Sequence, residues 1–423
     1  MRKYSFFLAA AALVFVGCAS DELRSDVQDE QIEIGFSTIT NKQTRAENST
    51  ADINGNLETY NNTFKVWGYK VVSGTETPVL GAVEGANNTY TYPGQLVEHK
   101  DADGTANPAV TEGWYYTPVR FWDKSASVYK FYAASPSRDD WSWDSSTKKV
   151  SIANFSITGY NSVTGTPATA IVSNKVLTAA LTTEDLMIST DIEDHKNFTN
   201  TPVNLSFNHI LSRLNIGVRK ATILDDYTVY LKSVKVFNMK SNGSFDESLA
   251  SGTTLSAGTV ARWTAASAPA TFTSGVGYEN ASGLEITSTA TTENTYYQYV
   301  YEGLAIPQSV AYKKTVLVND DVTGLAADSY IYLNGSNATA TSAPYIVIEY
   351  EIGKTENNVY TKHDSYKYYY NLADVFNADA TTAVDFCEGW QNTLKITLAP
   401  AAINFDADVY EWATKNDVPV VIE

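Results

Sequence analysis

The stretch Phe64-Lys65-Val66-Trp67-Gly68-Tyr69 decides the fold class of this chain. Aromatic and β-branched side chains dominate it, and such residues favour extended strands over helices. Similar patches recur about every ten to fifteen residues, separated by turn residues such as Ser73-Gly74 and Pro93-Gly94. This spacing is typical of antiparallel sandwiches and differs from alternating strand and helix units.

Strand composition continues along most of the chain, whereas helical periodicity is weak. A short helix is expected only at Thr182–Ser189. We therefore predict an all-β protein of two tandem antiparallel β-sandwich domains, transthyretin-like or Greek-key in topology, with few short helices. The expected strands are Thr63–Val72, Thr89–Tyr92, Gly113–Phe121, Val128–Ala133, Val150–Ile157, Leu205–Val218, Thr228–Asn238, Thr295–Ile306, Thr315–Asn319, Ala343–Ile352 and Tyr366–Leu372.

The length, composition and charge of the chain limit its number of domains and its binding partners. Its 423 residues suit two domains, and 43% apolar against 18% charged residues make it too hydrophobic to remain disordered. Lys and Arg total 30 and Asp and Glu total 48, so the net charge is −18. Such a chain is repelled by phosphate backbones and anionic bilayers, so nucleic acid is not an expected partner.

The amino terminus has the pattern of an export signal. Met1-Arg2-Lys3 is basic, Tyr4–Val16 is mostly apolar but too short to span a bilayer, and Gly17-Cys18 ends the segment like a lipobox. We expect residues 1–18 to be a lipoprotein signal peptide, with acyl chains on Cys18 that anchor the precursor to outer-membrane lipid. The alternative is an ordinary signal peptide that happens to contain a cysteine.

Residues 19–45 read as a leader that is removed on maturation. Ile32, Ile34 and Phe36 alternate with polar residues or glycine, so they lie on one face of a short strand. Arg45 follows in polar chain that a trypsin-like protease can reach, which would make Ala46 the new amino terminus. The alternatives are a cut at Lys42, or an Arg45 that is only a charged linker residue.

The remaining chain divides into an N-terminal domain, 46–200, and a C-terminal domain, 201–423. Its tail, 401–423, contains two strand patterns with apolar alternation, which suits donation to a neighbouring molecule. The alternative is that both strands close their own domain. The apolar positions expected to enter a neighbour are Ile403, Phe405, Val409, Val418, Val420 and Ile422.

Four segments together resemble one family, the fimbrillins of Bacteroidetes, which are lipoprotein precursors of protease-assembled (type V) pili. They are the leader Ile32–Phe36 with Arg45-Ala46, the run Thr117–Pro136 containing Arg120-Phe121-Trp122, Leu205–Leu214, and a tail with Trp390 and Trp412. The resemblance implies a structural subunit that loses its leader to a trypsin-like protease and polymerises by strand exchange with other fimbrillin subunits. It also implies a place first in the outer membrane and then in an extracellular fimbria that supports adhesion.

The physics of strand removal agrees with this function. A strand taken out of a sandwich leaves unpaired amides, carbonyls and apolar pockets, which an extended segment from another molecule can fill. The alternative function is a lipid-anchored surface protein that binds glycans through an aromatic platform at Trp141 and Trp143. A host or bacterial glycan or protein is then the expected ligand.

Nothing in the sequence indicates an enzyme, a metal or a cofactor. The four histidines lie far apart, no nucleophile elbow or nucleotide-binding loop occurs, and Asp101–Thr105 departs from a calcium loop. His209 is expected to be packed and hydrogen-bonded, and Cys387 to be a small buried hydrophobe without a disulfide partner. The histidines are His99, His195, His209 and His363.

Overall fold

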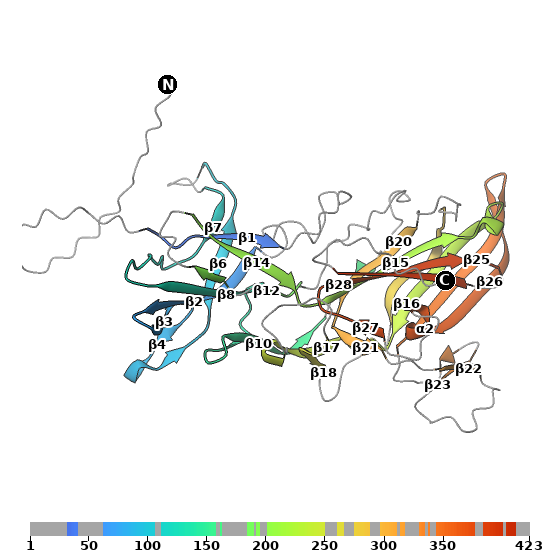
Figure 1. Cartoon of the computed structure of the whole chain (residues 1–423). Coiled ribbons are helices and arrows are strands. Elements are labelled where there is room, and N and C mark those ends of the chain that lie inside the picture. The colour runs from blue at the N-terminus through green and yellow to red at the C-terminus, as the bar shows by residue number, and fades with distance from the viewer. Residues whose placement is uncertain are drawn as a thin grey trace, which may run out of the picture.

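A computed structural model gives the structure of the chain. Figure 1 shows sheets of the N-terminal part on the left and sheets of the C-terminal part on the right, with helix α2 in the right-hand part. The described residues are 32–40, 62–105, 111–157, 161–162, 184–189, 192–194, 201–249, 260–265, 275–287, 297–310, 314–317, 330–334, 337–338, 344–376, 384–400 and 403–411.

A nine-stranded sheet forms the N-terminal body. The short strand β1 pairs parallel to β14 at one edge, and the remaining pairs are antiparallel. In order the sheet contains β1 (Phe36–Thr40), β14 (Val203–His209), β12 (Met187–Ser189), β8 (Val128–Ser135), β2 (Thr63–Val72), β6 (Gln95–Lys100) and β7 (Gly113–Tyr115), with β13 (Ile192–Asp194) on β8 and β3 (Thr75–Leu80) on β2.

Both faces of this sheet are covered, as the apolar run in β2 requires. Side chains of a strand alternate between faces, so Phe64 and Val66 enter one core while Trp67 and Tyr69 enter the other. The first core, which we call the leader core, also contains Ile34 and Phe36. The second is continuous with the C-terminal body.

A four-stranded sheet links the two halves of the sequence. Its strands β10 and β17 pair antiparallel although they lie far apart in sequence. The order is β18 (Trp263–Ala265), β17 (Asn242–Asp246), β10 (Lys149–Ser156) and β9 (Trp141–Asp144). Strand β14, which follows residue 200, belongs to the N-terminal sheet, and β10, which precedes residue 200, pairs with β17. Strand pairing therefore joins residues from both sides of the expected domain boundary at residue 200.

The C-terminal body is a sandwich of two sheets (Figure 1). Between them lie buried side chains such as Ile216 and Leu394 from one sheet and Val234 and Ile348 from the other. The first sheet contains β11 (Asn161–Ser162), β20 (Gln298–Ala305), β15 (Ser212–Lys220), β28 (Trp390–Leu398) and β29 (Ile403–Glu411); the second contains β19 (Val276–Glu285), β16 (Thr228–Phe237), β25 (Tyr345–Glu356) and β26 (Val359–Asn371).

The predicted all-β class is confirmed, and the expected helix at Thr182–Ser189 is wrong. Met187–Ser189 form strand β12 between β8 and β14. Both faces of the sheet are covered at this strand, so its residues are buried on both sides and do not alternate between apolar and polar. Periodicity alone does not distinguish such a continuous apolar run from a buried helix. Smaller elements are β21 (Gln308–Val310) with β27 (Val384–Phe386), β22 (Lys314–Leu317) with β23 (Tyr330–Asn334) and β24 (Asn337–Ala338), β4 (Val83–Glu84) with β5 (Tyr90–Thr91), helix α2 (Leu372–Phe376), and 3-10 turns at Ala86–Asn88, Thr222–Leu224 and Glu247–Leu249.

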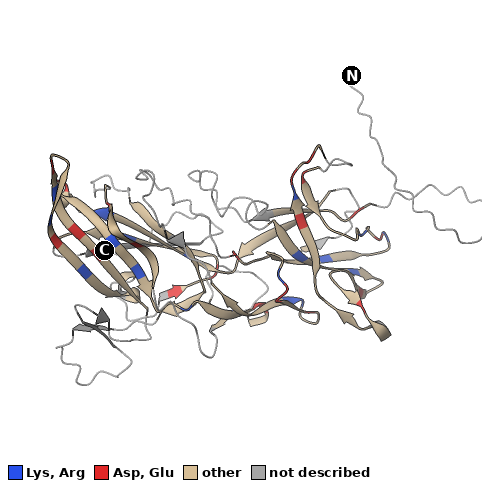
Figure 2. Ribbon diagram, turned by 180° about the vertical axis from the view of Figure 1, so that it is seen from behind, with Lys and Arg blue, Asp and Glu red and all other residues tan. Residues whose placement is uncertain are grey.

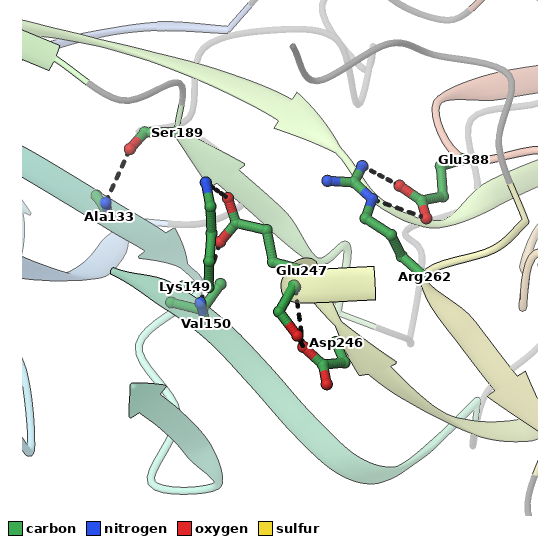
Figure 3. Close-up of polar contacts among 9 residues, drawn as sticks. Ala133, Lys149, Val150, Ser189, Asp246, Glu247, Arg262 and Glu388 are labelled. Atoms are coloured by element: carbon green, nitrogen blue, oxygen red, sulfur yellow. Dashed lines mark hydrogen bonds and ion pairs between the residues drawn. The ribbon is translucent and has the colours of Figure 1, made fainter. Parts of the chain in front are cut away.

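Polar contacts hold the linking sheet together and join it to the turn before β28 (Figure 3). Glu247 accepts bonds from Lys149 Nζ at 2.9 Å and from the Val150 amide at 3.0 Å. Arg262, beside β18, pairs with Glu388 in the turn before β28, with Nε 3.2 Å from Oε1. Both side chains of this second pair are buried, so each needs the other as its counter-charge.

Basic and acidic residues are interspersed along the strands (Figure 2). On the β25 and β26 sheet, for example, Glu351 lies between Lys232 and Lys362 at 3.2 and 3.6 Å. No helix in the described part of the chain is long and apolar enough to cross a membrane.

Candidate functional site

The residues expected to form the leader strand are embedded in the N-terminal body. Ile34 and Phe36 are 1% and 5% exposed, and Ile32 packs against the same leader core at partial exposure. The three side chains therefore share the face that packs into the leader core. Regular strand pairing begins at Phe36, where β1 starts.

The leader segment, Ile32–Thr40, makes backbone bonds on both of its edges. On one edge Ile34 donates to the Arg120 carbonyl and Trp122 donates to the Ile32 carbonyl, each at 2.9 Å. On the other edge Val203 donates to the Gly35 carbonyl at 2.8 Å, and β1 then runs parallel to β14. The segment thus lies between Arg120–Trp122 and β14 and is bonded to both.

Three aromatic rings surround the Phe36 ring. Phe64 and Phe131 meet it edge-on at centroid distances of 6.0 and 5.8 Å, and Tyr116 is tilted against it at 5.6 Å. Edge-to-face contacts of this kind stabilise a ring beyond the effect of its buried area. We call Phe64, Tyr116 and Phe131 the aromatic pocket.

The Tyr116 hydroxyl also bonds to the backbone of the leader segment. Its hydroxyl donates to the Ile34 carbonyl at 2.7 Å and accepts from the Arg120 amide at 3.2 Å. Burial raises the pKa of the Tyr116 phenol, so the hydroxyl keeps its proton for this bond at neutral pH. One side chain therefore joins the leader segment to the strand-like run that faces it.

The run Arg120–Trp122 is itself held in place. Asp123, next along the chain, accepts a bond from Lys70 Nζ on β2 at 2.7 Å, and its amide donates to the Tyr129 hydroxyl on β8. The bond from Lys70 lowers the pKa of Asp123, so the pair stays ionised at neutral pH. The Trp122 ring packs edge-on against the Tyr129 ring at 4.6 Å.

Sequence reasoning did not identify what faces the leader segment. Arg120-Phe121-Trp122 entered only as part of a family resemblance, and Tyr116 was not singled out. Neither contact is local, since Tyr116 lies 82 residues from Ile34. The sequence feature that points to this contact is the strand composition of Gly113–Phe121. In the structure this stretch contains β7 and the beginning of the run Arg120–Trp122.

The first of the two tail patterns forms a strand within its own sheet. β29 pairs antiparallel with β28 over nine residues, from Leu398↔Ile403 to Trp390↔Glu411. Ile403, Phe405 and Val409 therefore belong to the C-terminal sandwich of the same chain. Val418, Val420 and Ile422 lie outside the described residues, as do Cys18, Lys42, Arg45 and Ala46.

The two tryptophans of the glycan alternative do not form an exposed platform. Trp141 is 5% exposed, and its indole donates to the Pro136 carbonyl at 2.9 Å. Trp143 is half-buried, stacks on Trp67 at 4.9 Å and donates to the Tyr69 hydroxyl. Both rings pack against the second core, because β9 covers the second face of the N-terminal sheet.

The histidine and cysteine that could carry chemistry, His209 and Cys387, are both buried. His209 is buried, with Nδ1 2.7 Å from an Asp185 carboxylate oxygen, as a packed and hydrogen-bonded histidine should be. Cys387 is a free, buried thiol, and burial raises its pKa to about 12. Among the described residues, no cluster of His, Cys, Asp and Glu is arranged to hold a metal ion.

Comparisons with known proteins give structural likenesses only. No family model and no curated protein matches the chain. A candidate cell adhesion protein from Bacteroides uniformis is similar at 12% identity and a TM-score of 0.38, over 92% of this chain and 100% of that one. A fimbrial assembly protein from Parabacteroides distasonis is similar at 10% identity and a TM-score of 0.29, over 90% and 96%.

The tip fimbrial protein Mfa3 from Porphyromonas gingivalis, with a C-terminal truncation, is similar at 8% identity and a TM-score of 0.33. The match covers 84% of this chain and 96% of that chain. The descriptions of these neighbours name adhesion and fimbrial proteins. At these identities and TM-scores the likeness assigns no residue role to this chain.

Proposed function

We propose that this chain is a structural subunit of a cell-surface fimbria, exported as a lipoprotein precursor and matured by cleavage after Arg45. Cleavage removes the leader segment together with Cys18, so the subunit leaves its lipid anchor. The vacated position then accepts a strand from the tail of another subunit. The product is a fimbria with a structural and adhesive role, and no catalytic step is involved.

The observation that carries the proposal is the way residues 32–36 sit in the N-terminal body. Ile34 and Phe36 are buried, the segment is bonded on two edges, and it precedes a polar stretch that contains Arg45. The body around them keeps its other strand pairs when they leave, because β14, β12, β8, β2 and β6 pair without them. A removable strand in a sheet that persists is the requirement for strand exchange.

The energetics favour replacement of the leader segment over an empty position. Burying Ile34 and Phe36 contributes about 1.5–3 kcal/mol for each side chain. The backbone bonds to Arg120, Trp122 and Val203 each add about 0.5–1.5 kcal/mol net. Loss of the leader segment therefore exposes apolar surface and unpaired amides, and a strand of similar pattern regains most of what is lost.

Protease treatment of the purified, lipid-free precursor tests the proposal. A trypsin-like protease should give a new amino terminus at Ala46 by mass spectrometry, followed by SDS-resistant ladders and by filaments in electron micrographs. The matched control, Arg45→Ala, should keep its leader and remain monomeric. A different terminus without ladders or filaments would contradict the proposal.

The alternative, a glycan-binding protein that keeps its leader, predicts a different outcome. Residues 19–45 would remain on the cell-surface protein, and no assembly would follow protease treatment. The structure provides no platform at Trp141 and Trp143 for this function, so strand exchange is the better-supported reading.

A further inference from the structure

The run Arg120–Trp122, which bonds to one edge of the leader segment, also has supports of its own. The chain enters this run from β7, which pairs with β6, and leaves it into β8, which pairs with β2 (Figure 1). In the described sheet β1 pairs with β14 and with none of these four strands. We call Arg120–Trp122 together with the turn that follows, Asp123–Ser127, the wall.

Asp123 joins the wall to a pair of residues in the middle of the N-terminal sheet. Lys70 on β2 and Tyr129 on β8 are directly opposed across the two strands. Lys70 Nζ donates to the Asp123 carboxylate at 2.7 Å, and the Asp123 amide donates to the Tyr129 hydroxyl at 2.6 Å. One residue of the wall is therefore bonded through its side chain to one central strand and through its backbone to the next.

The Asp123 carboxylate also closes the turn that leads into β8. Its Oδ1 atom accepts bonds from the Ser125 amide at 2.9 Å and from the Ser125 hydroxyl at 2.6 Å. The Ala126 amide donates to the Asp123 carbonyl at 3.0 Å, and the Ser127 amide donates to the Val71 carbonyl at 2.8 Å. An aspartate that bonds to the backbone two residues on stabilises a turn locally, so this turn does not depend on the leader segment.

The chain just before the wall is held in the same independent way. Gln95, at the start of β6, donates from Nε2 to the Thr117 carbonyl at 3.0 Å. The Arg120 amide donates to the Tyr116 hydroxyl at 3.2 Å. In both bonds the donor and the acceptor lie outside residues 32–40, so removal of the leader segment leaves both bonds in place.

We propose that the wall keeps its position when the leader segment leaves, with Asp123 as the positioning residue that holds it. This inference rests on the proposed function, because it concerns the state between cleavage and assembly. The wall then loses the two backbone bonds of the Arg120 carbonyl and the Trp122 amide, and it keeps the bonds of Asp123. The vacated position stays open between the wall and β14. An incoming strand does not have to order this edge, which lowers the entropic cost of binding.

Hydrogen exchange followed by NMR in the lipid-free Cys18→Ser chain tests whether the wall stays ordered. The Arg120 and Asp123 amides bond to Tyr116 and Tyr129, whereas the Trp122 amide bonds to the leader segment. In dilute subunit, directly after cleavage and separation of the leader peptide, the Arg120 and Asp123 amides should stay protected while the Trp122 amide loses its protection. Loss of protection at all three amides would overturn the proposal, because the leader segment alone would then order the wall.

Asp123→Ala removes the carboxylate and tests its role. In the uncleaved chain the leader segment still holds the wall, so the Arg120 amide should exchange as in the parent. In the cleaved subunit this amide should exchange at least about tenfold faster than in the cleaved parent, and filaments should form more slowly. The matched control is Asp144→Ala, in the turn between β9 and β10, where Asp144 Oδ1 accepts from the Ser146 amide at 2.8 Å and hydroxyl at 2.6 Å. The control should leave both rates unchanged.

Lys70→Met separates the ion pair from the turn. The Lys70 and Asp123 side chains are 29% and 35% exposed, so solvent screens the pair, and this variant should act in the same direction as Asp123→Ala but more weakly. Parent exchange and assembly rates in cleaved Asp123→Ala would overturn the role of Asp123. If that variant does not fold, the exchange pattern of the parent decides the proposal by itself. Filaments from a parent with an unprotected wall overturn this inference alone, whereas a protected wall without filaments supports it and overturns the proposed function.

Discussion

Replacing Phe36 by Ala should destabilise the uncleaved chain and leave the processed chain unchanged. The ring is 5% exposed and touches Phe64, Tyr116 and Phe131. Removing a buried phenylalanine side chain costs about 3–5 kcal/mol. For a cooperative unit of about 150–250 residues, this lowers the melting temperature by about 6–20 °C.

Thermal and urea unfolding followed by circular dichroism measure the effect in two states of the protein. In the uncleaved chain the variant should melt below the parent by the amount given above. After cleavage at Arg45 and separation of the leader peptide, the two proteins have the same sequence and should unfold alike. Ile223→Ala, at a side chain 70% exposed, is the control and should change the uncleaved chain by less than about 0.5 kcal/mol. An uncleaved Phe36→Ala chain as stable as the parent would refute the reasoning.

Three further predictions concern single side chains. Tyr116→Phe should cost about 0.5–1.5 kcal/mol more in the uncleaved chain than after leader removal, because the leader carbonyl loses its donor only in the uncleaved chain; urea unfolding of both forms checks this. Arg262→Ala should destabilise the chain by about 3–5 kcal/mol in the same assay, since Glu388 remains buried without its counter-charge, and a change below about 1 kcal/mol would contradict the assigned role. Burial raises the pKa of Cys387 to about 12, so its thiolate is scarce at pH 8; a Cys18→Ser chain should react with Ellman's reagent only when unfolded, and rapid labelling of the folded chain would disprove burial.

Local pattern predicted the elements better than it predicted their partners. Thr63–Val72 was expected as a strand and is β2 with the same bounds, because aromatic and β-branched residues dominate it. The buried face of Ile32, Ile34 and Phe36 followed from alternation alone. Both results depend only on neighbouring residues in sequence, which is the information that periodicity contains.

The partners of those elements depend on contacts that no local pattern encodes. β14 lies parallel to β1 and far from it in sequence, and Arg120–Trp122 faces the leader segment from a run without regular strand pairing. The expected helix at Thr182–Ser189 failed for the related reason that a central strand is covered on both faces, so its apolar residues do not alternate. In each case contacts between residues far apart in sequence determine the pairing partner or the type of element.

Hydrogen exchange at two amides tests most directly whether the leader segment is a replaceable strand. Trp122 and Val203 donate to the Ile32 and Gly35 carbonyls, so their amides should be protected in the uncleaved chain. They should exchange faster in dilute, processed subunit and become protected again in filaments, while the Ile210 amide, bonded elsewhere, stays protected throughout. Equal exchange at Trp122 and Val203 before and after leader removal would contradict the account.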